Sequence, residues 1–294
     1  MPPRATTALM RERELGQTGE RVSAVGLGCM RLSLAHRPPE HEAVAIIRRA
    51  LELGVTLLDS ADGYALDERE RGHNERLIAM ALAGRRDEVL VATKGGVARP
   101  GGRWVIDARP ARLRAACEES LRALGSDRID LYQLHAPDPR VPFEESVGTL
   151  AELRRAGKIR LLGLSNVTRT QIEVAMRITE IVSVQNELSV LARAAEQDGT
   201  VAFCAERRLT FLAYRPLAGR QGATRLGEIP ALAAAAERLQ ATPARVALAW
   251  LLARWPHVIP LPGPTRITTL EDAVRAAELA LTEGDAEAIA AGAS

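Results

Sequence analysis

Residues 57–64 read LLDSADGY, an apolar pair that runs into Asp59 and reaches Tyr64 five residues later. Two similar stretches follow, VATKGG around Lys94 and LYQLH up to His135. Each short apolar run predicts a strand buried on both faces, as in a parallel sheet covered by helices. In a closed barrel of parallel strands, the strand ends meet at one mouth. The sequence therefore predicts that these four side chains lie together, although they are far apart in the chain.

Each of the four residues has a plainer interpretation when it is taken alone. Asp59 at a strand end can cap the following helix, Lys94 can be a solvated charge, and a single His in an apolar strand can be a satisfied core residue. All four, however, stand at the carboxyl end of a βα unit or just beyond it. Charges with a purely structural role would not be expected at the same end of several strands, so the coincidence favours a functional site.

The rest of the chain alternates apolar runs with amphipathic stretches. Apolar residues recur at helical spacing in 40–53 and 111–124, residues 226–256 predict two successive helices, and 282–291 predict a final one. Eight strands are predicted, at 24–28, 56–59, 89–94, 129–135, 159–165, 181–187, 210–214 and 258–261. This alternation predicts the α/β class and an eight-stranded parallel (β/α)8 TIM barrel.

The N-terminal region is expected to differ from the repeating units. Residues 1–10 predict a flexible tail, and RERELGQTGERVSAVGLG predicts a hairpin that leads into the first barrel strand. No linker or low-complexity tract follows, so residues 11–294 are expected to form a single barrel domain. The length of 294 residues suits this, because such barrels typically need about 250.

Composition argues against several classes of function. The 39 basic and 37 acidic residues give a net charge of +2 without a basic block, which argues against nucleic acid as a partner. Cys29, Cys117 and Cys204 have no CxxC spacing, so neither a disulfide framework nor a metal site is expected. No apolar run approaches the ~18 residues that span a membrane, and no signal peptide is apparent. We expect a soluble cytoplasmic protein, a monomer or a weak homo-oligomer.

The order Asp59, Tyr64, Lys94 and His135 resembles the catalytic tetrad of the aldo-keto reductase family, and the likeness extends over residues 13–290. It implies an NADP-dependent oxidoreductase that reduces a small aldehyde or ketone to an alcohol by hydride transfer. In this interpretation Tyr64 is the general acid, and Lys94 lowers its pKa. Asp59 positions Lys94, and His135 orients the carbonyl. Tyr64 and His135 would both contact the substrate.

The resemblance also implies where the cofactor binds. No GxGxxG follows a first strand, so a Rossmann domain is unsupported. In the family, Ser, Asn and Gln side chains hold the nicotinamide carboxamide, and an aromatic residue stacks on the ring. A plainer interpretation of Ser165 and Asn166 is a helix N-cap. The implied positions are Gly28, Cys29, Met30, Asp59, Ser165, Asn166, Gln185, Tyr214, Arg215, Pro216, Leu217, Gly219, Arg220, Gly263, Thr265, Arg266 and Asp272.

The segment IPLPGPTRITTLEDA resembles the one that binds the adenosine 2′-phosphate in the family. Its Gly-rich turn at a helix N-terminus offers N–H groups to an anion, and Arg266 adds a guanidinium. The family often has Arg at the position of Thr269 and Asn at that of Ala273, and it often has Ser at Arg215. We therefore expect NADPH as cofactor, with NADH binding more weakly.

The substrate is less well defined by the sequence. GLSNVT followed by IVSVQNELSV is similar to bacterial pyridoxal reductase-like members, which suggests a small aldehyde as substrate, with aromatic aldehydes among the candidates. The chain lacks the long C-terminal loop of the steroid- and sugar-reducing members, so an open site is expected. Trp104, in the long loop 95–110, is the candidate for a substrate wall. It could equally be a surface Trp packed on its own loop.

Two other functions stay open on the sequence alone. One is a Schiff-base lyase on the same barrel, with Lys94 as the nucleophile. The other is a nicotinamide-binding sensor or auxiliary protein with low turnover. Fold alone does not decide between these and the reductase.

Overall fold

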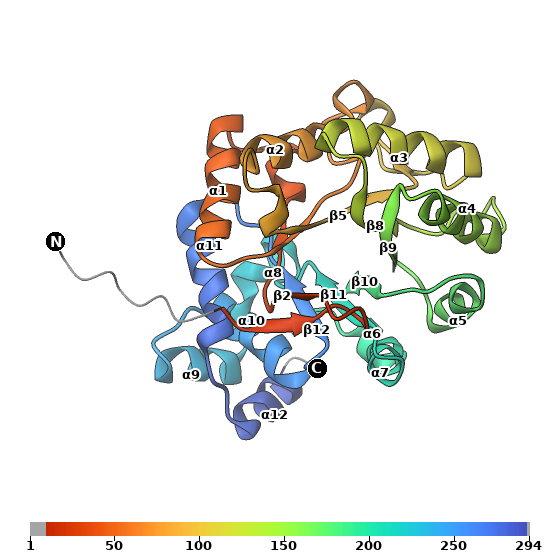
Figure 1. Ribbon diagram of the computed structural model, residues 1–294. Coiled ribbons are helices and arrows are strands. Elements are labelled where there is room, and N and C mark those ends of the chain that lie inside the picture. Colours follow the sequence, from red (N-terminus) through yellow and green to blue (C-terminus); the bar gives the residue numbers. More distant parts are fainter. Residues whose placement is uncertain (1–9, 293–294) are drawn as a thin grey trace.

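The computed structural model describes residues 10–292, so the predicted flexible tail lies outside the described residues except for Met10. Within this range, eight parallel strands form one sheet in the spatial order β3, β4, β5, β8, β9, β10, β11, β12 (Figure 1). Their bounds are β3 Leu27–Gly28, β4 Leu57–Asp59, β5 Leu90–Gly95, β8 Ile129–Leu134, β9 Ile159–Ser165, β10 Ser183–Glu187, β11 Thr210–Tyr214 and β12 Val258–Leu261. The predicted parallel β/α architecture is confirmed.

Backbone hydrogen bonds close the sheet between its first and last strands. The amide of Gly26 donates to the carbonyl of Pro260 at 3.0 Å, and that of Gly28 donates to Pro262 at 2.9 Å. A Cβ on Gly28 would lie 2.9 Å from the carbonyl oxygen of Leu261. Glycine at this position therefore permits the close approach that completes the barrel.

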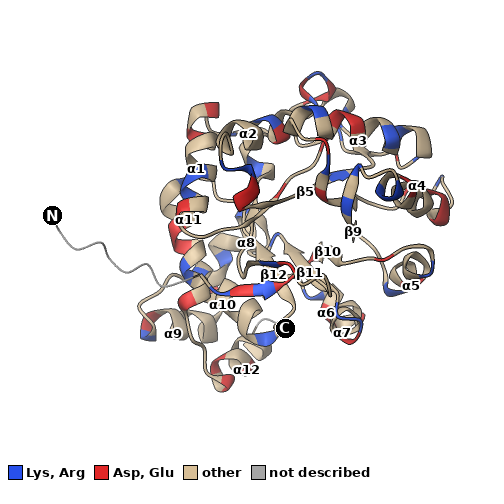
Figure 2. Cartoon of the chain, viewed as in Figure 1, with Lys and Arg blue, Asp and Glu red and all other residues tan. Residues whose placement is uncertain are grey.

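Helices surround the barrel, as Figure 1 shows, and charged residues of both signs are interspersed along them (Figure 2). Their bounds are α1 Glu40–Glu52, α2 His73–Ala81, α3 Pro110–Leu124, α4 Phe143–Arg155, α5 Arg169–Ile178, α6 Ala194–Gln197, α7 Thr200–Glu206, α8 Gly219–Arg225, α9 Pro230–Arg238, α10 Pro243–Arg254, α11 Ile267–Val274 and α12 Glu283–Gly292. The two helices predicted within 226–256 are α9 and α10, and Thr242 caps the second through the amide of Arg245. No helix among the described residues is long and apolar enough to cross a membrane.

A hairpin closes the amino end of the barrel. Strand β1 (Glu12–Glu14) pairs antiparallel with β2 (Arg21–Ser23). Leu15 and Val22 are buried in one apolar cluster with inward-facing residues of the barrel strands. The predicted hairpin is therefore confirmed, and it fills the end of the barrel opposite the strand ends that carry Asp59 and Lys94.

Side chains inside the barrel change character along the strands. Toward the amino ends the interior is apolar, with Leu57, Leu90, Ala92, Leu131, Leu161 and Leu212 in the same cluster as the hairpin residues. Because strand side chains alternate in direction, residues two positions further on also face inward. These are Asp59 after Leu57, Lys94 after Ala92, and Gln133 after Leu131. The sequence thus builds a polar layer above an apolar one.

Candidate active site

Lys94 stands at the centre of the polar layer and is completely buried. Its Nζ donates to Asp59 Oδ2 at 2.7 Å, to the backbone carbonyl of Ser60 at 2.7 Å, and to the hydroxyl of Tyr64 at 3.1 Å. Burial lowers the pKa of Lys94, but the charge of Asp59 and the contact with Tyr64 together outweigh it and raise the pKa. Lys94 is therefore a protonated ammonium whose three N–H groups all have acceptors.

Tyr64 lies in the loop after β4, with its ring beneath Lys94 Nζ at 4.9 Å from the ring centroid. Burial raises the pKa of its hydroxyl above the ordinary value, while Lys94 acts in the opposite direction. The expected lowering of this pKa by Lys94 is present, but removal from water outweighs the neighbouring charge, so the net shift is upward. At neutral pH the hydroxyl is protonated.

Asp59 has more partners than the sequence suggested. Gln185 Nε2 donates to its Oδ1 at 2.7 Å, and Gln133 Nε2 donates to the same oxygen at 3.3 Å. Gln133 is fully buried and was not identified from the sequence. The pattern that could have identified it is the single amide side chain inside the apolar run LYQLH. This residue stands two positions before His135 and therefore on the same face of the strand. Both amides stabilise the charged form of a carboxylate that would otherwise have only Lys94 as a partner.

His135 completes the group of four. Its ring centroid lies 5.7 Å from that of Tyr64, at an interplanar angle of 82°. Burial and then the charge of Lys94 lower the pKa of His135 to about 3, so the imidazole is neutral at physiological pH. Its Nδ1 is buried and has no hydrogen-bond partner within the described part of the chain. A neutral imidazole carries one N–H, which can donate to an oxygen beside Tyr64.

Trp104 forms a wall beside this group. It lies in the loop after β5, where β6 (Val97–Ala98) and β7 (Val105–Ile106) pair as a small hairpin. Its ring meets Tyr64 edge-on at 6.3 Å and His135 at 6.4 Å between centroids, and 48% of the residue is exposed. A half-exposed aromatic ring against two proposed catalytic rings suits a substrate wall better than packing within its own loop.

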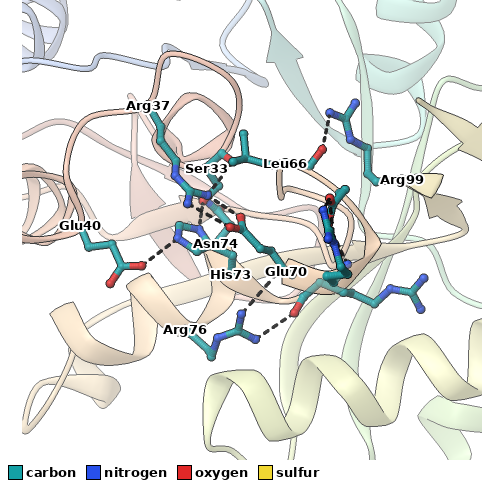
Figure 3. A network of polar contacts seen from close by, with 12 residues as sticks. Ser33, Arg37, Glu40, Leu66, Glu70, His73, Asn74, Arg76 and Arg99 are labelled. Atoms are coloured by element: carbon teal, nitrogen blue, oxygen red, sulfur yellow. Dashed lines mark hydrogen bonds and ion pairs between the residues drawn. The ribbon is translucent and has the colours of Figure 1, made fainter. Parts of the chain in front are cut away.

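A buried polar network braces the loop that carries the site (Figure 3). Asn74, at the start of α2, accepts from the hydroxyl of Ser60 at 2.7 Å and donates to the Cys29 carbonyl at 2.8 Å and to Ser33 Oγ at 2.7 Å. His73 contacts the same serine at 2.8 Å. Because the carbonyl of Ser60 holds Lys94, this network ties the ammonium to α2 and to the loop after β3. None of its residues except Cys29 was singled out from the sequence.

The residues expected to hold a nicotinamide gather next to His135. Asn166 donates to the His135 carbonyl at 2.9 Å and to Ser165 Oγ at 3.1 Å, and it accepts from the Tyr214 hydroxyl at 2.8 Å. Asn166 has a φ of 56°, a conformation rarely seen outside glycine and asparagine. Three polar strand ends, β9, β10 and β11, therefore present amide and hydroxyl groups at one place. This donor set fits a planar ligand that carries a carboxamide.

The loop after Tyr214 has an unusual backbone. Arg215 and Ala218 both have positive φ, 48° and 54°, and neither is glycine. Such strain concentrates where ligands bind. The Arg215 guanidinium lies 3.3 Å from Glu187 and is half-exposed. The other expected cofactor residues of this segment, Pro216, Leu217, Gly219 and Arg220, follow in the loop and the first turn of α8.

The expected phosphate segment follows β12, the strand that pairs with β11. Arg266 is the N-cap residue of α11, and the first turn of that helix contains no acidic residue. A Cβ on Gly263 would lie 3.2 Å from the Gly28 carbonyl and 3.3 Å from Arg31 Cγ, so this turn lies against the segment of Gly28, Cys29 and Met30. An exposed Arg at a helix N-terminus without acidic neighbours suits a phosphate.

Asp272 does not join the candidate cofactor residues. Its carboxylate accepts from Arg245 Nε at 3.0 Å and also pairs with the terminal nitrogen of that guanidinium. These contacts connect α11 to α10. The expected role in cofactor binding therefore has no support from the placement of this side chain. Among the described residues, no cluster of three or more His, Cys, Asp or Glu side chains could hold a metal ion.

Comparisons with known proteins agree with this geometry. The sequence model of the Aldo/keto reductase family matches residues 24–293. Probable aldo-keto reductase 1 of Glycine max is 34% identical over 310 residues, covering 95% of this chain and 88% of that protein. A thermostable aldo-keto reductase solved with the inhibitor epalrestat superposes with a TM-score of 0.81 at 31% identity, covering 96% of this chain and all of that one.

A third relative was solved with a cofactor. An aldo/keto reductase from Klebsiella pneumoniae, in complex with NADP and acetate, superposes with a TM-score of 0.81 at 27% identity. The likeness covers 96% of this chain and 94% of that one. The barrel and the match along nearly the whole sequence lead to one conclusion. The chain belongs to the aldo/keto reductase family of oxidoreductases.

Proposed function

We propose that this protein uses NADPH to reduce the carbonyl of a small aldehyde or ketone to an alcohol, with Tyr64 as the general acid. The observation that carries the proposal is the buried ammonium of Lys94, which donates to both Asp59 and Tyr64. Neutral His135 lies edge-on to the same phenol. An acid, a cation behind it and a neutral hydrogen-bond donor together match what carbonyl reduction needs.

Each residue has a distinct role in this proposal. When bound, NADPH supplies the hydride that adds to the carbonyl carbon. Tyr64 gives its proton to the carbonyl oxygen as negative charge develops there, and Lys94 stabilises the phenolate that is left. His135 donates a hydrogen bond that orients the same oxygen. Asp59, held by two amides, keeps Lys94 in place and balances its charge.

The raised pKa of Tyr64 supports reduction as the favoured direction. A phenol that stays protonated at neutral pH is ready to act as an acid. Oxidation of an alcohol requires the phenolate, which burial disfavours. We therefore propose that the reductive reaction proceeds well at neutral pH, while the oxidative reaction needs a higher pH.

The cofactor assignment rests on the donor set described above and on the Klebsiella pneumoniae relative solved with NADP. Ser165, Asn166 and Gln185 would hold the carboxamide, and Tyr214 would stack on the nicotinamide ring. Arg266 and the first turn of α11 would bind the 2′-phosphate, which gives NADPH an advantage over NADH.

The alternative of a Schiff-base lyase has less support. A lysine nucleophile must be deprotonated, and a lowered pKa usually achieves this. Lys94 has a raised pKa, and its N–H groups are all engaged. A sensor with low turnover would not need a neutral imidazole and a protonated phenol side by side, so the geometry favours an active reductase over this alternative as well.

An aldehyde panel with NADPH consumption as the readout tests the proposal. We expect steady-state turnover with at least one small aldehyde, and a large loss of turnover when Tyr64 is replaced by Phe. Incubation of the aldehydes with borohydride, in the absence of NADPH, tests the lyase. A covalent adduct on Lys94 would overturn the reductase assignment, and tight NADPH binding without turnover would favour the sensor.

A further inference from the structure

Arg99 is a buried cation without a counter-ion. It follows β6, and only 9% of the residue is exposed. Among the described residues, no carboxylate lies within ion-pair distance of its guanidinium. Its only side-chain hydrogen bond goes from a terminal nitrogen to the carbonyl of Leu66, at 3.3 Å (Figure 3). Its Nε is buried and has no hydrogen-bond partner in the described part of the chain.

The nearest carboxylate does not supply the missing charge. Glu68 accepts from the backbone amide of Arg99 at 2.9 Å, and its other oxygen pairs with Arg71. Burial lowers the pKa of Arg99, and no neighbouring acid counters this shift. A buried charge is normally paired, because an unpaired one loses its hydration without compensation. Arg99 therefore has the capacity for an anionic partner that residues 10–292 do not provide.

The position of Arg99 connects it to the proposed substrate site. Its Cζ lies 4.0 Å from the centroid of the Trp104 ring, and that ring contacts both Tyr64 and His135. Its Cγ lies 3.8 Å from where a Cβ on Gly63 would stand. The Arg99 side chain thus packs against the loop that carries Tyr64. The Trp104 ring contacts both the Arg99 guanidinium and the ring of the proposed acid, Tyr64.

Apolar side chains are exposed around the same mouth. Leu66, Trp104 and Ile106 are each more than a third exposed, although they are large and hydrophobic. Leu66 supplies the carbonyl that holds Arg99, and the other two lie in the hairpin loop after β5. A ligand that suits this wall has an apolar body and one anionic group.

We propose that Arg99 determines substrate specificity by pairing with an anionic group, a carboxylate or a phosphate, on the aldehyde. This inference rests on the proposed reductase function and narrows its substrate class to aldehydes with an apolar spacer and a distal anion. The guanidinium would bind the anion through its terminal nitrogens, in the forked geometry that suits both groups.

The test compares pairs of similar aldehydes, one anionic and one neutral. Para-carboxybenzaldehyde is measured against its methyl ester, and para-formylphenyl phosphate against para-methoxybenzaldehyde, which separates the two sources of the anion. The proteins are wild type, Arg99→Met, Arg99→Lys, and Arg103→Met as a control. Arg103→Met removes the same charge from the same loop, but Arg103 is exposed.

For Arg99→Met we expect the ratio of kcat/KM for acid over ester to fall by about 10- to 150-fold, the value of a charge-assisted hydrogen bond. The loss should lie mainly in KM, because the anion binds away from the reacting carbon. Arg99→Lys should keep part of the preference, since it keeps the charge but not the fork. Arg103→Met should keep all of it.

Three results would overturn the inference. An unchanged acid-to-ester ratio in Arg99→Met would show that Arg99 only supports the loop. An equal fall in Arg103→Met would indicate general electrostatic steering. If no aldehyde is reduced by any of these proteins, the proposed function itself fails. In that case a tryptophan-fluorescence titration with benzoate still tests the anion site, and equal affinity of wild type and Arg99→Met would exclude it.

Discussion

The Nζ of Lys94 and the hydroxyl oxygen of Tyr64 lie 3.1 Å apart, and both side chains are buried. Their protonation is therefore coupled. Lys94 lowers the pKa of Tyr64 while burial raises it, and Tyr64 in turn helps to raise the pKa of Lys94. A substitution of either residue should therefore affect the protonation of the other.

Tyr64→Phe removes the proton donor and leaves the ring in place. We expect kcat for aldehyde reduction to fall by on the order of 10²- to 10⁴-fold, the usual contribution of general acid catalysis. The readout is steady-state NADPH consumption. Tyr132→Phe is the matched control, because Tyr132 is a buried Tyr whose hydroxyl lacks a partner among residues 10–292. A near wild-type rate in Tyr64→Phe would remove Tyr64 from the role of acid.

Lys94→Met should slow alcohol oxidation more at neutral than at high pH. The phenolate of Tyr64 is the form needed in this direction, and removal of the ammonium raises its pKa further. The measurement is the pH profile of oxidation. Since Met would leave Asp59 without a counter-ion, the double variant Asp59→Asn with Lys94→Met serves as the control for stability. Identical profiles in wild type and both variants would contradict the role given to Lys94.

Arg266→Ala should reduce the preference for NADPH over NADH. Loss of a charge-assisted hydrogen bond to the 2′-phosphate costs about 1.5–3 kcal/mol, which changes the ratio of the two dissociation constants by roughly 10- to 150-fold. Fluorescence titration of both cofactors measures this ratio. Arg275→Ala removes a charge from the other end of α11 and should leave the ratio unchanged. Equal losses for both cofactors in Arg266→Ala would mean that Arg266 only supports its loop.

Glu75→Gln should change how stability depends on pH. Glu75 is fully buried, accepts from Thr93 Oγ1 at 2.6 Å, and burial raises its pKa to about 7. An acid with a raised folded-state pKa contributes stability that is present below its unfolded pKa of about 4.3 and is lost as the pH rises through the folded value. The wild type should therefore lose stability on the order of 3 kcal/mol between these limits.

Urea unfolding at several pH values between acid and mildly alkaline conditions tests this prediction. The free energy of unfolding of Glu75→Gln should depend less on pH over that range. Glu173→Gln, at a partly exposed position of α5, should behave like the wild type. If the wild type and Glu75→Gln have parallel pH dependences, the carboxyl of Glu75 ionises normally.

The strand ends were predictable because parallel barrel strands are short, apolar and periodic. Asp59 and Lys94 were found as polar residues that end such runs, and the alternation of side chains places both inside the barrel. The same alternation indicates Gln133, but a Gln within an apolar run reads as an ordinary strand residue. Its contact with Asp59 depends on how three separate strands are aligned in the sheet. This alignment cannot be predicted from one sequence alone.

Other features depend on packing that no local pattern encodes. Asp272 pairs with Arg245 because α10 and α11 lie side by side, and each residue alone looks like an exposed helical charge. The direction of the Tyr64 pKa shift depends on how completely the ring is buried. The first strand begins at Leu27, three residues later than the predicted 24–28, although the amide of Gly26 already donates to Pro260 of the last strand.

The polar layer of Asp59, Lys94, Gln133 and Gln185 lies directly above an apolar one. Apolar side chains of similar volume in place of a buried ion pair often leave stability unchanged or increase it. A random library selected only for heat resistance would therefore accept hydrophobic substitutions in this layer. Directed evolution of this barrel needs an activity screen at every round, because the most heat-resistant clones are expected to include inactive ones.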